Sequence, residues 1–387
     1  MRRRDFLKLA AAAAAQVSVG SSLFARAASA SPAVGGPGPY GELLPPDANG
    51  LMLPAGFRSR IVARGDAEVA GTGHVWHRAA DGGACFRSEG GGLAPGYVYV
   101  SNAEISNGAG GVGALRFDWN GDLVDAYAIC SGTSRNCAGG ATPWGTWLTC
   151  EEVAAGQVYE CDPQGALAPI VRPLLGTFNH EAVAADPIGR RLYLTEDRGN
   201  GLLYRFTPAV WGDLSAGTLE AATSDDGALG WSAVGDPSAS KTQTRDQVEG
   251  ALRFARGEGI AYANGHVYFA TTTDNRVWDL DISAQTITVF YSRGLDPSSH
   301  LAKPDNVAAS RSGDIVVAED ADNLEIVLLT PDCVAAPIVR ITGQTGTEVT
   351  GPAFDPLGRR LYFSSQRAEA GGITYEVEGP FRRVPPP

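Results

Sequence analysis

A repeated segment recurs along most of the chain and constrains its fold more than any other feature. Residues 186–194 read DPIGRRLYL and residues 355–363 read DPLGRRLYF, so the two copies differ at only two positions. Each copy is a turn followed by a strand of alternating character. Looser copies occupy residues 262–270, 310–318 and 95–100, and each copy is followed by a polar loop and a further short strand. The pattern predicts six similar units, each a small antiparallel sheet.

The spacing of these units is typical of a β-propeller. We count the units from Cys137, Glu181, Glu258, Asp305 and Gly351. The steps between them are 44, 77, 47 and 46 residues, and a four-stranded blade takes about 40–50 residues. The long step contains residues 207–250, which we interpret as a polar, loop-rich insertion between blades. The sequence therefore predicts an all-β fold, a single six-bladed β-propeller over residues 31–387, in which residues 57–62 close the last blade. A parallel β-solenoid is the alternative.

The first 30 residues predict an export signal. Arg2-Arg3-Arg4 precede Phe6-Leu7-Lys8 and an alanine-rich stretch, and residues 28–30 offer an Ala-x-Ala cleavage site. The paired arginines resemble a twin-arginine signal, which implies the twin-arginine export machinery as a partner and a periplasmic or secreted mature protein. A transmembrane anchor is the alternative, although polar residues interrupt the apolar run.

Charge and composition exclude several classes of partner. The formal net charge is −12 and no run of Lys or Arg follows the signal, so we expect no nucleic-acid partner and no membrane association after signal cleavage. An anionic substrate would require bound cations. The 49 glycines and 24 prolines indicate many turns, which agrees with an all-β chain. We expect a monomer.

Acidic residues fall at two fixed places on the repeat. The first position, at the start of each innermost strand, carries Asp81, Cys137, Glu181, Glu258 and Asp305. The second position, after the second strand, carries Glu104, Glu151-Glu152, Glu196-Asp197, Asp274 and Glu319-Asp320. In a propeller both positions can gather at one mouth of the channel, where converging carboxylates repel one another unless hard cations bind them. The sixth blade has Gly351 and Gln366 instead and is expected to be less involved. The alternative is that these acids cap turns and face solvent.

Cys137 occupies a first-position slot that is otherwise acidic. A thiolate favours iron or zinc over calcium, so we interpret Cys137 as a metal ligand. The glycines that follow it would let the backbone approach a ligand closely. Half of a disulfide is the alternative.

Several motifs resemble the PhoX-type alkaline phosphatase family. Residues 136–152 read NCAGGATPWGTWLTCEE, and shorter matches are HE at 180–181, YLTED at 193–197, LYRFTP at 203–208, RGE at 256–258 and PDN at 304–306. The resemblance implies a six-bladed propeller that holds Fe³⁺ and Ca²⁺ and hydrolyses phosphate monoesters. This chain is short beside the larger enzymes of that family.

The resemblance also implies roles for individual residues. Cys137 would ligate iron, Glu258 would be a metal ligand, and Arg256 would face the phosphate. A surface ion pair is the alternative for Arg256. By their place on the repeat, ligand status extends to Glu104, Glu151, Glu181, Glu196, Asp305 and Glu319. Asn306 could donate a further hydrogen bond to the substrate, a small-molecule phosphoester.

Two other functions are compatible with an acidic propeller channel. A calcium-dependent lactonase-like hydrolase would use similar carboxylates without needing Cys137 or Arg256. A non-catalytic, calcium-stabilised binding propeller would keep the carboxylates and have no turnover.

Overall fold

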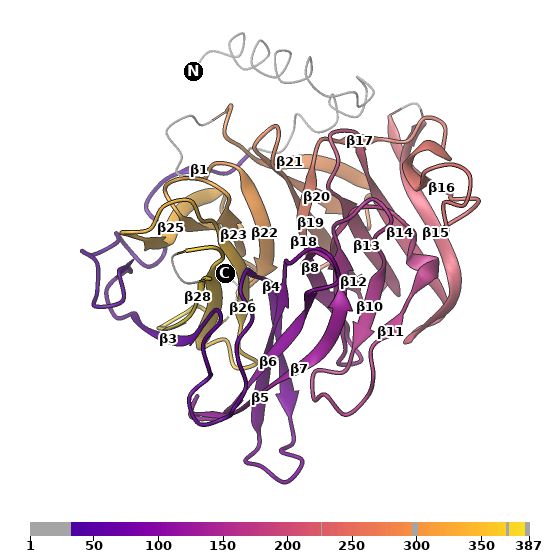
Figure 1. Cartoon of the computed structure of the whole chain (residues 1–387). Coiled ribbons are helices and arrows are strands. Elements are labelled where there is room, and N and C mark those ends of the chain that lie inside the picture. Colours follow the sequence, from indigo (N-terminus) through magenta and orange to yellow (C-terminus); the bar gives the residue numbers. More distant parts are fainter. Residues whose placement is uncertain (1–31, 226, 296–300, 369–370, 384–387) are drawn as a thin grey trace, which may run out of the picture.

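The computed structural model describes residues 32–225, 227–295, 301–368 and 371–383, which form a ring of β-sheets (Figure 1). The predicted export signal at residues 1–30 lies outside the described residues. Strands in the described ranges assemble into six sheets. Within those ranges, no helix has both the length and the apolar character needed to cross a membrane.

Each sheet presents its first strand to the centre of the ring. The inner strands of blades 1 to 6 are β4 (Ala80–Ser88), β8 (Asn136–Ala141), β12 (His180–Asp186), β18 (Gly257–Ala263), β22 (Pro304–Ala309) and β26 (Val349–Phe354). Each inner strand contacts the next in chain order, and β26 contacts β4. Their labels gather at the middle of Figure 1. The ring is closed, so the predicted six-bladed propeller is confirmed.

The strands that follow each inner strand pair antiparallel and continue the blade outward. Blade 1 continues with β5 (Gly96–Ala103), β6 (Gly110–Asp118) and β7 (Leu123–Thr133), blade 2 with β9 (Trp147–Glu151), β10 (Val158–Cys161) and β11 (Ile170–Val171), and blade 3 with β13 (Arg191–Glu196), β14 (Gly201–Val210), β15 (Asp213–Asp225) and β16 (Ala228–Ala233). Blade 4 continues with β19 (His266–Thr271), β20 (Arg276–Asp281) and β21 (Thr286–Ser292), blade 5 with β23 (Ile315–Glu319), β24 (Glu325–Leu329) and β25 (Val334–Ile341), and blade 6 with β27 (Arg360–Ser365) and β28 (Ile373–Glu378).

An N-terminal strand completes the last blade. Strand β3 (Arg58–Arg64) pairs antiparallel with β28, with Ile61 opposite Tyr375. This confirms the prediction that residues 57–62 close the ring. The short strands β1 (Val34–Gly35) and β2 (Leu51–Met52) add to the outer edge of blade 5 by pairing with β25.

The interval 207–250 is only partly a loop. The end of β14, the long β15 and all of β16 lie within it and extend blade 3 to five strands. A polar segment with the short 3₁₀ helix η2 (Thr244–Asp246) follows, and β17 (Arg253–Phe254) then pairs back to β14. The expectation of a loop-rich insertion was wrong for β15 and β16. Their buried leucines, Leu214, Leu219 and Leu229, are separated by small and polar residues, which weakens the alternation in the sequence.

The repeated Asp-Pro turn is built by its own aspartate. Oδ1 of Asp186 accepts hydrogen bonds from the backbone amides of Ile188 and Gly189, both at 2.9 Å. Oδ1 of Asp355 accepts the amide of Arg360 at 2.8 Å. Such aspartate-centred turns deliver the chain into β13 and β27 at the same point of the repeat.

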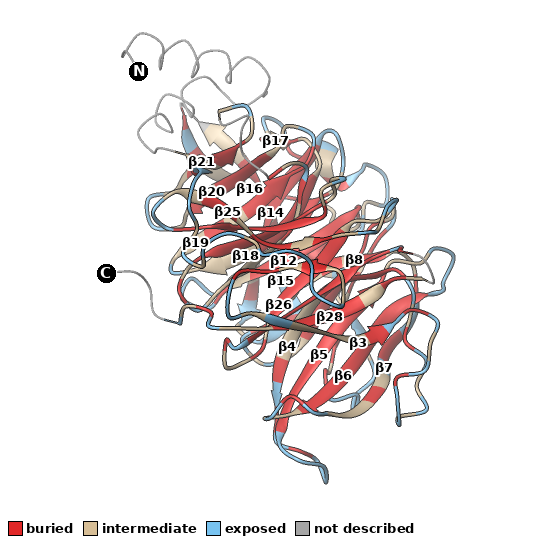
Figure 2. Cartoon of the chain, turned by 90° about the vertical axis from the view of Figure 1, so that its left-hand side faces the viewer, coloured by how far each residue is buried: buried red, intermediate tan, exposed pale blue. Residues whose placement is uncertain are grey.

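Large aromatic side chains pack between blades. Tyr99 of blade 1 stacks on Tyr362 of blade 6, with ring centroids 5.0 Å apart, and both rings are fully buried. Trp147 of blade 2 donates its ring N–H to Oδ1 of Asn102 in blade 1 at 2.9 Å. Burial is concentrated in the strands, and the loops carry most of the exposed residues (Figure 2). This packing fixes the blades relative to the channel they surround.

Candidate metal centre

One backbone hydrogen bond recurs in all six blades at the same end of the channel. It joins the amide just after the second strand to a carbonyl just before or at the start of the inner strand, over 2.9 to 3.2 Å. The donors, which we call post-strand residues, are Glu104, Glu152, Asp197, Thr272, Asp320 and Gln366. The acceptors, which we call rim residues, are Ala79, Arg135, Asn179, Arg256, Lys303 and Glu348. Each blade therefore brings one residue of each kind to the same mouth.

A β-bulge aims the first-position residues. In every blade the pairing of the inner strand shifts within its first residues, as between His180 and Val183 in β12. The first-position residue is the second residue of its strand in blades 1 to 5. A bulge interrupts the strand alternation and can redirect a side chain. Residues far apart in the sequence thus converge on the channel.

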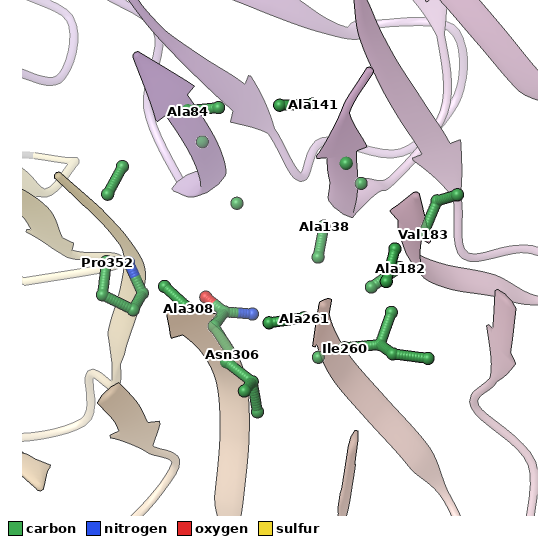
Figure 3. Close-up of a pocket in the computed structure, with 18 of the residues that line it drawn as sticks. Ala84, Ala138, Ala141, Ala182, Val183, Ile260, Ala261, Asn306, Ala308 and Pro352 are labelled. Carbon is green, nitrogen blue, oxygen red and sulfur yellow. The ribbon is translucent and has the colours of Figure 1, made fainter. Parts of the chain in front are cut away.

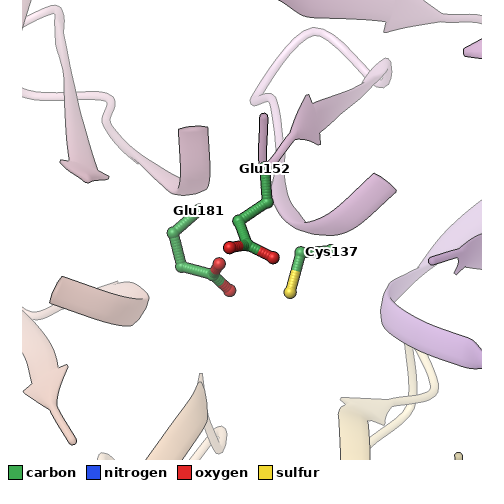
Figure 4. A group of neighbouring side chains, drawn as sticks. All are labelled: Cys137, Glu152 and Glu181. Atoms are coloured by element: carbon green, nitrogen blue, oxygen red, sulfur yellow. The ribbon is translucent and has the colours of Figure 1, made fainter. Parts of the chain in front are cut away.

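Four of the predicted ligands lie together. Cys137, Glu152 and Glu181 form one group with metal-ligand spacing (Figure 4), and Glu181, Glu258 and Asp305 form a second. In each group the candidate ligand atoms lie within 4.8 Å of one another. Glu181 belongs to both groups. The sequence predicted all of these residues except Glu152, for which it favoured the neighbouring Glu151.

The carboxylate of Glu181 is buried without a hydrogen-bond donor. Its side chain is 0% exposed, and neither oxygen has a partner among the described residues. Burial raises the pKa of Glu181 well above its ordinary value, and the charges of Glu258 and Asp305 raise it further. An unpaired buried carboxylate is costly unless a proton or a metal ion neutralises it. The residues present therefore fit a bound cation.

The other members of the two groups have shifted pKa values for the same reasons. Burial raises the pKa of the Cys137 thiol, as do the charges of Asp81 and Glu181. Burial also raises the pKa of Glu152 to about 8, although Arg135 opposes the shift. A metal ion would reverse these shifts, because its positive charge favours the ionised ligands.

Four predicted ligands, Glu104 and three glutamates at strand ends, are not brought into either group. Oε1 of Glu151 accepts the amide of Ser134 at 2.8 Å, and its Oε2 accepts the amide of Gln157 at 3.2 Å. Glu196 pairs with Arg245 and accepts the Tyr204 hydroxyl at 3.0 Å. Glu319 accepts the amide of Ala302. Glu151, Glu196 and Glu319 are the last residues of β9, β13 and β23. Their partners include Ser134 and Ala302, which lie in the connections that lead into blades 2 and 5.

The alternation of side chains along a strand explains why Glu151, Glu196 and Glu319 point away from the two groups. Neighbouring residues at a strand end point in opposite directions. The post-strand residue of each pair, namely Glu152, Asp197 or Asp320, is therefore the one at the channel mouth. A signal was present in blade 1, where the sequence reads Ala103-Glu104 and only the second residue is acidic. Aligning every pair on Glu104 would have selected the post-strand residue. In blade 4 that residue is Thr272, whereas Asp274 pairs with Arg276 at 3.0 Å.

Glu104 lies at the mouth but is fully engaged by protein groups. Its Oε1 accepts from Arg135 at 2.9 Å, and its Oε2 accepts from Gln366 at 3.0 Å and pairs with Arg367. Gln366 also donates to Asp81. Neither ligand group contains a residue of blade 6, but its neutral Gln366 and cationic Arg367 hold the carboxylates of blade 1.

Arg256 is held at the rim in an extended fork. Its Nε and Nη2 donate to the two carboxylate oxygens of Asp197 at 2.9 and 3.1 Å, and Nη2 lies 3.0 Å from Oε1 of Glu258. The side chain is 43% exposed. It is thus accessible to solvent while in contact with a member of the second group.

Asn306 is buried between the rim and the channel. Its Nδ2 donates to Oδ1 of Asp305 at 3.0 Å, and its Oδ1 accepts the amide of Gly351. The amide nitrogen has a second hydrogen. A hydrogen bond from Asn306 to substrate remains a prediction.

The channel below the mouth is narrow and lined by small residues (Figure 3). Its volume is about 320 Å³, and alanine and glycine provide most of its wall. A Cβ on Gly140 would lie 1.9 Å from the carbonyl oxygen of Val183, and one on Gly139 would lie 2.0 Å from that of Leu148. These glycines therefore allow neighbouring strands to approach each other, rather than allowing the backbone to approach a ligand as expected.

The chain resembles known proteins in sequence and in fold. The family described as "Alkaline phosphatase PhoX" matches residues 97–288, about half of the chain. A PhoX structure from Pseudomonas fluorescens, in complex with vanadate as a transition-state analogue, superposes with a TM-score of 0.71 at 16% identity over 87% of this chain and 97% of that one.

A more distant likeness is to a gluconolactonase from Xanthomonas campestris. It gives a TM-score of 0.53 at 12% identity over 89% of this chain and 99% of that one. Among curated proteins no sequence matches the chain. Both structural likenesses agree with the propeller fold, and only the first combines with a sequence match. Through residues 97–288 the chain belongs to the PhoX family of alkaline phosphatases.

Proposed function

We propose that the protein is a metal-dependent phosphoesterase that hydrolyses phosphate monoesters. The observation that carries this proposal is the pair of ligand groups that share Glu181, with the guanidinium of Arg256 beside the second group. Family membership and the likeness to the vanadate-bound PhoX support the same activity. The substrate would be a small-molecule phosphoester.

The donor atoms suggest a different metal for each group. Cys137, Glu152 and Glu181 combine a thiolate with carboxylates and would suit Fe³⁺. Glu181, Glu258 and Asp305 offer only oxygen and would suit Ca²⁺. When bound, such ions supply an activated water at mild pH and neutralise charge on the phosphoryl group.

Protein side chains would orient the substrate. Arg256 would donate to non-bridging phosphate oxygens through its planar fork. Asp197 holds the Nε and Nη2 edge of the guanidinium through two hydrogen bonds, so the Nη1 side would face the phosphate, and this fixed orientation reduces the entropy lost when substrate binds. Asn306 would add a hydrogen bond from its second amide hydrogen.

The two rival functions predict different metal content and reactivity. A calcium-dependent lactonase-like hydrolase or a non-catalytic binding propeller would contain calcium without iron. The test is to purify the protein without chelator, measure iron and calcium, and assay p-nitrophenyl phosphate. Iron with calcium and hydrolysis supports the proposal, and calcium alone without hydrolysis rejects it.

The role of Cys137 has a matched control. Cys137→Ala is expected to lose iron and most of the hydrolysis. Cys333→Ala removes a thiol directly before β25, where Sγ lies 3.9 Å from the carbonyl oxygen of Pro331, and should change neither. Equal rates and equal iron in Cys137→Ala and the wild type would remove Cys137 from the site.

We also propose export through the twin-arginine pathway to the periplasm or beyond. The support is the sequence of residues 1–30. The test is cell fractionation of the wild type and of Arg2-Arg3 replaced by lysines. Export that does not depend on the arginines would reject the proposal.

A further inference from the structure

Arg135 and Arg256 occupy equivalent places on the repeat. Both are rim residues, and both lie two residues before a first-position ligand, Cys137 or Glu258. Both have left-handed backbones, with φ of +49° and +57°. Their side chains are also alike in exposure, at 39% and 43%.

The left-handed backbone belongs to the fold and is not itself evidence of function. Ala79 and Lys303, the rim residues of blades 1 and 5, have φ of +51° and +40°. Such a conformation favours glycine or asparagine. Three of these four positions nevertheless carry a long cationic side chain. The identity of the side chain, rather than the strain, needs an explanation.

Each of the two arginines contacts a different ligand group. Arg135 pairs with Glu152, a member of the group that contains Cys137. Arg256 pairs with Glu258, a member of the group that contains Asp305. The groups share Glu181, so an anion attracted to cations held there would have one guanidinium beside each group. When metal ions neutralise Glu152 and Glu258, the attraction of those carboxylates for the arginines weakens.

We propose that Arg135 is a second phosphate-binding residue that acts together with Arg256. This inference rests on the proposed function, and it adds a residue to which no role has been assigned. The two forks would divide the non-bridging oxygens of one phosphoryl group between them. Guanidinium groups suit this task because they are always charged and pair with phosphate in a bidentate manner.

The test measures binding of inorganic phosphate to the metal-loaded protein by titration calorimetry at fixed salt. Arg135→Asn is the main variant, because asparagine tolerates the left-handed backbone. We expect it to weaken phosphate binding by about ten- to a hundredfold, and Arg256→Asn to do the same. Arg135→Lys, which keeps the charge and loses the fork, should fall between these variants and the wild type.

Arg78→Gln is the control. Arg78 precedes the rim residue of blade 1, is 60% exposed and pairs with Asp66, which belongs to neither group, at 2.8 Å. Its phosphate affinity should stay within about twofold of the wild type, since exposed ion pairs contribute little. Iron and calcium are measured in every variant, so that a change in phosphate affinity can be separated from a loss of metal.

The possible results separate the two hypotheses. If Arg135→Asn keeps its metals and binds phosphate as the wild type does, the role of Arg135 is wrong while the phosphoesterase proposal stands. If it loses metal instead, Arg135 merely supports Glu152 and the inference is again wrong. A metal-loaded wild type that neither binds phosphate nor hydrolyses p-nitrophenyl phosphate would overturn both.

Discussion

The two halves of the channel mouth carry the same residue types but give them different partners. In the half formed by blades 2 to 5, Glu181 has no hydrogen-bond donor among the described residues. In the half formed by blades 6 and 1, Asp81 accepts the Gly82 amide at 2.7 Å and a Gln366 amide, and Glu104 is held by two arginines. A carboxylate at a propeller mouth is therefore not a metal ligand by position alone. Glu181, whose two oxygens have no donor among the described residues, is the carboxylate that most needs a cation.

The largest effect is expected when Glu181, the ligand that the two groups share, is replaced. Glu181→Gln removes a charged ligand from both groups, so we expect both metals to be lost and hydrolysis to fall by more than about a hundredfold, since even outer-shell changes cost 10- to 100-fold. Glu104→Gln, in the other half, should retain its metals. Metal analysis and p-nitrophenyl phosphate assays measure both. Equal metal loss in the two variants would mean that the halves do not differ.

Removal of the metals should destabilise the protein and make its stability depend on pH. A ligand present at a thousand times its Kd contributes about 4 kcal/mol to the free energy of unfolding, and a chelator removes that contribution. In the folded protein without metal, burial raises the pKa of Glu152 to about 8, against an ordinary value of 4.5. Between these values the unfolded chain has released its proton while the folded state keeps it, so stability falls as pH rises.

The slope is at most about 1.4 kcal/mol per pH unit for each such group. Thermal unfolding of the metal-free protein at pH 5 and pH 8 checks whether stability falls as pH rises, with the metal-loaded protein as the control. A metal-free protein that is more stable at pH 8 than at pH 5 would contradict this prediction.

Neighbouring glutamates should show opposite defects. Glu152→Gln removes a ligand and should lower iron content, and in the metal-free protein it should cost little stability, since the charge of Glu152 is unfavourable there. Glu151→Gln weakens two hydrogen bonds to backbone amides and should cost about 1–3 kcal/mol of unfolding free energy while iron is retained. Iron analysis of both variants, and denaturant unfolding of both after the metals are removed, measure these opposite defects. Identical behaviour of the two variants would refute the prediction.

The smallest effect is expected in the protein-paired half. Arg367→Gln removes ion pairs to Glu104 and Glu348 from a side chain that is 46% exposed. Such pairs are worth at most about 1 kcal/mol, and Gln366 still donates to Glu104. Metal content should not change. If iron or calcium were lost, this half would take part in metal binding after all.

The sequence predicted the features that depend on the period of the repeat. Blade number, ring closure through β3, and the convergence of Cys137, Glu181, Glu258 and Asp305 all follow from spacing. The choice between Glu151 and Glu152 does not, because a shift of one residue reverses the direction of a side chain at a strand end. Only the register of β9 fixes that direction.

The part played by blade 6 was also hidden in the sequence. Gln366 is uncharged, and Glu348 lies three residues before Gly351 rather than two, so neither stands out in a search for in-phase acids. Their effect depends on contacts across the boundary with blade 1. Such contacts between blades carry no periodic signal in the chain.

The pairing of β3 with β28 joins residues more than 300 positions apart. During synthesis, blades 1 to 5 can form as each emerges, but the ring cannot close until the last strand has left the ribosome. Strand β3 is made first and must wait unpaired until β28 has been made, and an exposed strand edge invites association with other chains. Prompt pairing of β3 is thus the protein's own protection against aggregation while it folds.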